Sequence, residues 1–154
     1  MAEDARGLTP ETYVESAEGS VLMAETPNKG FAVLTRLPSG ALGFRQLIRV
    51  TTVGPVPLVR VVLESGHAIT VAAGHPFYRL GMKPVPAAVL VPGEQLEAAF
   101  RYPDGYGPPD LPDFTPRAGI TVVAVLPAGE GPVMTGTVRE THALFLAAGI
   151  LCGE

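Results

Sequence analysis

His75 is the residue whose type and position most clearly allow chemistry. It stands between Gly74 and Pro76, directly after an apolar stretch that is typical of a β-strand. Glycine and proline both oppose continued pairing, so the strand is expected to end at this histidine, where a side chain is held by the sheet and can still be reached. Imidazole, with an unperturbed pKa of about 6.5, suits proton transfer near neutral pH. The alternative is a structural histidine that caps a turn.

A second pair of candidate residues, His142 and Cys152, lies near the end of the sequence. A free thiol near a histidine can be activated as a nucleophile, which would allow a hydrolase, but their spacing leaves open whether the two side chains meet. The other interpretation of Cys152 is a small apolar residue that ends the last strand. A single cysteine permits no internal disulfide and no cysteine-based zinc site, and we expect no cofactor or metal.

The distribution of glycine and proline predicts an all-β fold to position these side chains. The 18 glycines and 16 prolines separate short runs that are rich in β-branched residues. A helix is predicted only over 10–18, where Thr9 offers an N-cap and Pro10 suits the first helical position. Residues 101–117, rich in proline, glycine and aspartate, are predicted to form a long loop. The predicted strands are 20–24, 30–35, 44–52, 58–64, 68–72, 77–80, 83–85, 94–98, 121–126, 131–138 and 143–147.

The motif Gly74-His75-Pro76-Phe77 and the segment 85–96 resemble the Hint superfamily, the self-processing domain of inteins, Hedgehog C-terminal domains and bacterial intein-like domains. Residues 16–21 are similar to the family's opening Cys-Phe-x-Gly-Ser/Thr. Residues 141–151 are similar to its closing Thr-His-x-Phe-x-x-x-Gly-Ile-Leu-Val-His-Asn. The resemblance implies an all-β, Hint-type fold of mostly antiparallel, strongly curved strands with a pseudo-twofold. It also implies a protein-splicing type of autoprocessing, with degenerate active-site motifs.

The chemistry that this resemblance implies is an N–S or N–O acyl shift, in which the first side chain of the domain attacks the preceding carbonyl. Ser16 is then the nucleophile, and His75 is the acid that protonates the departing amide nitrogen. Serine is a poorer nucleophile than a thiolate, Ala72 replaces the family's threonine, and Gly153-Glu154 replaces the closing His-Asn pair. These departures imply slow cleavage or none. The site that the resemblance implies comprises Ser16, Ala72 and His75, with the chain's own N-terminal flanking peptide as substrate. His142 and Cys152 are the candidate catalytic residues of the alternative chemistry.

Two functions therefore stay open. The first is an impaired or inactive self-processing domain that cleaves at its N-terminal junction. The second is a non-catalytic Hint-fold module that binds a protein partner or has a structural role. In either case, residues 1–13 are expected to form an N-terminal extension and 14–154 a single Hint-like domain that includes the loop 101–117.

Composition excludes several other classes of protein. The net charge of −4, without a cluster of Lys or Arg, argues against a nucleic-acid partner, because phosphate contacts dominate such binding. Proline and glycine interrupt every apolar run before it reaches the roughly 18 residues that a membrane-spanning helix needs. The acidic start, with Glu3 and Asp4, does not resemble a signal peptide. We therefore expect a cytoplasmic protein without a membrane partner.

Overall fold

The computed structural model describes residues 5–28, 30–98 and 119–154, so the loop predicted at 101–117 lies outside the described residues. The predicted all-β class is confirmed, since the only helices in the described ranges are the short 3₁₀ helices η2 (Met23–Asn28) and η3 (Ala87–Val89). Neither has the length and apolar character required to cross a membrane. The strands are β1 (Tyr13–Ser16), β2 (Gly19–Leu22), β3 (Ala32–Arg36), β4 (Leu42–Leu63), β5 (Ala68–Ala72), β6 (Pro76–Arg79), β7 (Lys83–Pro86), β8 (Gln95–Glu97), β9 (Gly119–Val138), β10 (Ala143–Phe145) and β11 (Leu151–Gly153).

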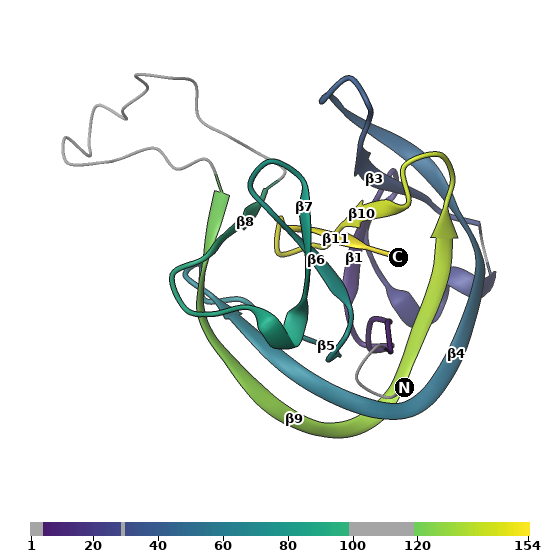
Figure 1. The fold of residues 1–154 in the computed structure, drawn as a ribbon. Coiled ribbons are helices and arrows are strands. Elements are labelled where there is room, and N and C mark those ends of the chain that lie inside the picture. Colours follow the sequence, from purple (N-terminus) through teal and green to yellow (C-terminus); the bar gives the residue numbers. More distant parts are fainter. Residues whose placement is uncertain (1–4, 29, 99–118) are drawn as a thin grey trace.

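The long strands β4 and β9 form the frame of the molecule. They pair antiparallel along most of their length and curve together around the other strands (Figure 1). Four shifts of register interrupt this pairing, and such irregularities bend a ribbon and increase its twist. The sequence predicted two strands in place of each of these, because Gly54-Pro55 and the glycine-rich segment around Gly129 resemble strand breaks. In the structure these residues curve the ribbon without ending it.

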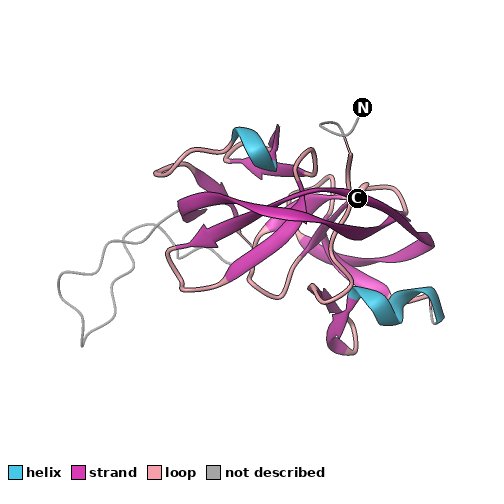
Figure 2. Ribbon diagram, turned by 90° about the horizontal axis from the view of Figure 1, so that it is seen from below, coloured by secondary structure: helices cyan, strands magenta, loops and turns pink. Residues whose placement is uncertain are grey.

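The remaining strands extend this ribbon into one sheet, in the order β10-β11-β6-β8-β9-β4-β3-β1-β2, with β5 paired to β4 and β7 to β6. Seen from below, the molecule is flattened: it is thinner in this view than it is tall in the view of Figure 1 (Figure 2). The order places β11, at the end of the described chain, beside β6, where Cys152 is opposite Phe77. The strand that follows His75 therefore packs directly against the last strand.

Residues 5–13, which we expected to belong to an extension outside the domain, pack inside it. Leu8 forms β-bridges to Met134 of β9 and to Val71 of β5, and its side chain is only 2% exposed. The hydroxyl of Thr9 donates a hydrogen bond to the carbonyl of Thr70. The segment ahead of β1 thus belongs to the described domain, because Leu8 pairs with both β5 and β9.

The predicted helix over 10–18 is wrong. Residues 13–16 form β1, which pairs in a hairpin with β2 from Tyr13–Leu22 to Ser16–Gly19. Val14 and Ser16 are buried and Tyr13 is exposed, which is the period of two that a strand requires. Gly19, at a φ of 101°, allows the tight reversal between the two strands. This local pairing outweighs the helix-start signal of Thr9-Pro10.

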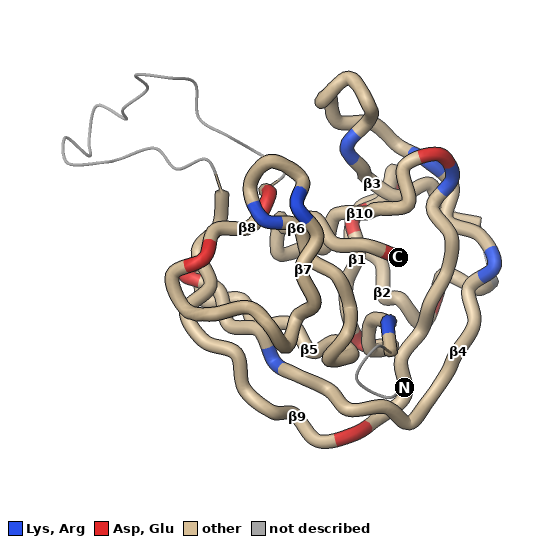
Figure 3. Tube along the Cα trace, in the orientation of Figure 1, with Lys and Arg blue, Asp and Glu red and all other residues tan. Residues whose placement is uncertain are grey.

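Many charged residues of the described ranges lie on the outer strands and turns (Figure 3), whereas Glu97 is buried. The largest completely buried side chains are almost all apolar, among them Phe77, Phe145 and Leu8. His75 is as deeply buried as these, with no exposed surface. A polar ring in such a place must be held by specific contacts.

Replacing Leu8 tests whether the first described residues belong to the core. Because its side chain is buried between β5 and β9, Leu8→Ala should lower the free energy of unfolding by about 2–5 kcal/mol. The matched control is Leu126→Ala, since that leucine of β9 is 49% exposed and should cost no more than about 0.5 kcal/mol. Urea denaturation measures both, and equal losses would contradict the placement of Leu8.

Candidate functional site

The ring of His75 is held at a corner between β5 and β6. The amide of His75 donates to the carbonyl of Ala72 at 2.9 Å, and its carbonyl accepts from the amide of Ala87 at 2.9 Å. Phe77 packs edge-to-face on the imidazole, with 5.9 Å between the ring centroids and 81° between the planes. These contacts fix both the backbone and the ring orientation of a residue that the sequence identified as a candidate.

The group that faces this ring is the backbone amide of Gly7, which donates to Nδ1 of His75 at 3.0 Å. Two further hydrogen bonds align the same segment with the β5 corner, from the amide of Ala72 to the carbonyl of Gly7 at 3.0 Å and from the amide of Gly74 to the carbonyl of Ala5 at 3.1 Å. A nitrogen that accepts carries no proton, so the neutral ring is protonated at Nε2. The ring of His75 thus accepts a hydrogen bond from a backbone N–H of its own chain.

The surroundings of His75 strongly favour the neutral ring. Burial, followed by the positive charge of nearby Arg6, lowers the pKa of His75 from 6.5 to about 3. Nε2 makes no well-formed hydrogen bond in the described structure. The nearby backbone of Gly153 raises the pKa of His75, but by less than burial and Arg6 lower it. Near neutral pH the ring therefore accepts a hydrogen bond and holds no proton at Nδ1 to donate to the nitrogen of Gly7.

Ser16 lies at the turn of the β1–β2 hairpin. Its hydroxyl donates to the carbonyl of Gly19 at 2.7 Å and accepts from the amide of Glu18 at 3.1 Å. Both partners belong to its own turn, and the amide that His75 contacts is that of Gly7, nine residues earlier. The hydroxyl thus stabilises a turn. The pairing of Ser16 with His75 that the resemblance implied finds no support in these contacts.

Ala72 does lie at the site, and it acts through its backbone. Its methyl group is buried, and its amide is the donor to the carbonyl of Gly7. Gly7 itself was not among the site residues predicted from the sequence. The sequence signal that could have indicated Gly7 is Glu18-Gly19, which is typical of a tight turn and makes Ser16 a hairpin residue. The start of the domain then has to lie closer to the N-terminus.

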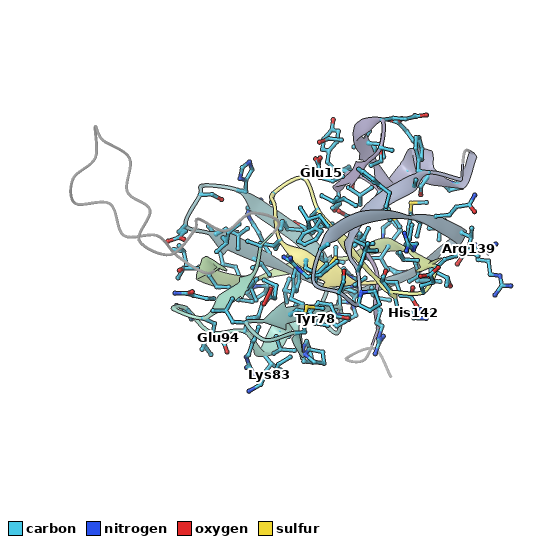
Figure 4. All side chains as sticks on the ribbon, turned by 90° about the horizontal axis from the view of Figure 1, so that it is seen from above. Glu15, Tyr78, Lys83, Glu94, Arg139 and His142 are labelled. Atoms are coloured by element: carbon cyan, nitrogen blue, oxygen red, sulfur yellow. The ribbon has the colours of Figure 1, made fainter. Side chains whose placement is uncertain are left out.

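His142 and Cys152 are not brought together. Cys152 is completely buried opposite Phe77, and burial raises the pKa of its thiol far above the usual range. His142 lies at the outer edge near Arg139 (Figure 4), where Nδ1 is 2.9 Å from Oε1 of Glu154. A thiol in this state is a poor nucleophile near neutral pH, and the nearest acid–base partner of His142 is a carboxylate.

The closing pair Gly153-Glu154 is anchored close to the same corner. Oε2 of Glu154 accepts from the amide of Val138 at 2.7 Å, which ties the last described residue to the end of β9. Gly153 packs so tightly on Pro76 that an added Cβ would lie 2.5 Å from the proline Cγ. The first and last described segments therefore meet on either side of His75 and Pro76.

Comparison with solved structures identifies this architecture. The structure is similar to the Ssp DnaB mini-intein variant M86, with a TM-score of 0.78, 15% identity and coverage of 97% of this chain and 94% of that chain. It is similar to a bacterial intein-like domain from Clostridium thermocellum, with a TM-score of 0.77, 16% identity and coverage of 97% and 99%. A DnaB intein from Synechocystis sp. PCC 6803 gives a TM-score of 0.75 at 15% identity, with coverage of 97% and 98%.

The chain therefore has the Hint fold, and the fold implied by the resemblance is confirmed. At these low identities the similarity establishes the fold and leaves the activity to be argued from the site. No protein-family model matches the sequence, and no curated protein matches it significantly.

The pKa of His75 predicts a pH dependence of stability. The unfolded chain protonates this residue below about pH 6.5 and the folded chain only near pH 3, so the free energy of unfolding should be complete above pH 6.5 and fall as the pH decreases toward 3. One such proton changes the free energy by up to about 1.4 kcal/mol per pH unit. His75→Asn keeps an acceptor near Nδ1 and does not titrate, so its stability should vary less.

Urea denaturation between about pH 5 and pH 7 measures this slope, since most carboxyl groups titrate below that range. His67→Asn is the matched control, because it makes the same replacement at an exposed residue of the β4–β5 turn. A slope in His75→Asn equal to that of the wild type would show that His75 is not buried in the neutral form.

Proposed function

We propose that this chain is a Hint-type self-processing domain whose cleavage at its N-terminal junction is impaired or absent, and that the junction is the Arg6–Gly7 peptide bond. The observation that carries the proposal is the hydrogen bond from the amide of Gly7 to Nδ1 of the buried His75. A group that assists cleavage must contact the nitrogen of the scissile bond. His75 contacts the nitrogen of Gly7, which supports this bond as the junction in place of the one before Ser16.

The missing part of the chemistry is a nucleophile. An acyl shift at Arg6–Gly7 would use the side chain of residue 7, and glycine has none. The hydroxyl of Ser16 is bonded within its own turn, and the thiol of Cys152 is buried with a raised pKa. None of these groups is available as an activated nucleophile at the junction.

The acid that protonates the departing nitrogen and the donor that stabilises the oxyanion are also weakened. The neutral His75 holds no proton at Nδ1 for the departing nitrogen, because burial lowers its pKa. The amide of Ala72 donates to the carbonyl of Gly7, one peptide beyond the Arg6 carbonyl on which an oxyanion would form. The site therefore holds the junction peptide in position and stabilises its ground state, which favours an intact chain.

A non-catalytic binding module is the second candidate, and an open groove favours it. This groove of about 450 Å³ lies between the segment before β1 and the edge of β5, with the β10–β11 turn at one side. Apolar side chains such as Ile69 and Leu146 line it together with the hydroxyl-bearing Thr12 and Tyr13. In this candidate function the N-terminal segment, held at His75, forms one wall of a surface for a protein partner.

The intact mass of the purified protein tests the proposal. We expect the chain to stay full length for days at neutral pH, with or without hydroxylamine or a thiol, because no ester can form at the junction. Loss of residues 1–6 would show an active junction at Arg6–Gly7, and loss of residues 1–15 would show that the junction precedes Ser16. Ser16→Ala serves as the matched control, since a fragment that persists in it does not depend on that hydroxyl.

A further inference from the structure

Gly7 and the residue after it are held by hydrogen bonds on three sides. Its amide meets His75, its carbonyl meets Ala72, and the next residue, Leu8, exchanges two hydrogen bonds with Met134 of β9 at 3.0 and 2.7 Å. The pairing with Met134 places Gly7 beside Val133, the preceding residue of β9. Residue 7 is therefore held between His75, β5 and β9.

A side chain at position 7 would collide with Val133. A Cβ built on Gly7 lies 2.5 Å from Cγ2 and 2.7 Å from Cβ of Val133, and 3.1 Å from the carbonyl oxygen of Met134. Distances below 3.0 Å require a displacement. Val133 is completely buried and is paired with Val53 of β4, and its β-branched side chain has little rotational freedom. The φ of Gly7, +142°, adds strain for any other residue.

We infer that Val133 is the residue that excludes a side chain, and with it a nucleophile, from position 7. This inference rests on the proposed junction at Arg6–Gly7, and it makes Val133 a specificity-determining residue of that site. The acyl shift at the junction is then prevented in two ways. Gly7 has no side chain, and Val133 fills the space that a side chain would need. Gly7→Cys alone would displace the segment from His75 without placing a thiol beside the Arg6 carbonyl.

A double-mutant cycle tests this role. Gly7→Ala adds the smallest side chain, and Val133→Gly removes both atoms that lie within 3.0 Å of it, leaving the contact with the Met134 carbonyl. The control is Val138→Gly, which removes an equally buried valine of β9 that is not among the nearest neighbours of Gly7. The urea midpoint of each single and double variant is measured. Coupling between the two sites isolates their interaction from the cost of each change.

We expect Gly7→Ala to lower the midpoint by the same amount in the wild type and in Val138→Gly, and by less than half of that amount in Val133→Gly. Equal losses in all three backgrounds would overturn the inference. If Gly7→Ala does not fold alone, recovery of folded protein with Val133→Gly but not with Val138→Gly supports the inference, and recovery with both or with neither overturns it.

A second measurement separates exclusion at the site from general packing. The ring of His75 is titrated by NMR in both double variants. Gly7→Ala with Val133→Gly should keep residue 7 on His75 and the ring neutral well below pH 6, whereas Gly7→Ala with Val138→Gly should raise the titration midpoint toward the ordinary value. Identical titrations would contradict the role of Val133. Spontaneous cleavage of the wild-type chain would instead overturn the proposed function and leave the coupling result unaffected.

Discussion

The hydrogen bond between the amide of Gly7 and Nδ1 of His75 is the contact on which the site depends. It joins residues 68 positions apart in the sequence and lies where neither group can reach water. A buried ring nitrogen without a hydrogen-bond partner would cost free energy, and here the peptide N–H of Gly7 satisfies Nδ1. The same contact fixes the tautomer of the ring, defines which peptide bond faces it, and aligns the first described segment with the corner between β5 and β6.

The β4–β9 ribbon makes this contact possible. Its curvature brings Met134 within reach of Leu8, so that the N-terminal segment pairs with β9 on one side and with β5 on the other. The close approach that this pairing demands is tolerated because residue 7 is a glycine. The Hint fold and a glycine at position 7 are therefore compatible in one structure. The contacts that hold the N-terminal segment use its backbone groups and do not depend on a side chain at position 7.

The sequence predicted the fold class, the strand 68–72 and the end of that strand before His75, because these features depend on local patterns of β-branched residues, glycine and proline. It did not predict the strand at 13–16, where the Thr9-Pro10 helix signal was outweighed by pairing with β2. It also placed the start of the domain at residue 14 and the nucleophile at Ser16. Position 7 could not be predicted because it is defined by contacts with β5 and β9, which are remote in the sequence. In addition, a short motif can be aligned at several places when its nucleophile is absent.

NMR of the side-chain and backbone nitrogens reports directly on the contact between Gly7 and His75. In protein labelled with ¹⁵N, we expect a neutral His75 ring protonated at Nε2 and an unprotonated Nδ1 that shows a scalar coupling to the amide nitrogen of Gly7. The ring should not become protonated as the pH is lowered through 6.5. A ring protonated at Nδ1, or one that titrates near pH 6.5 without a coupling to Gly7, would contradict this contact.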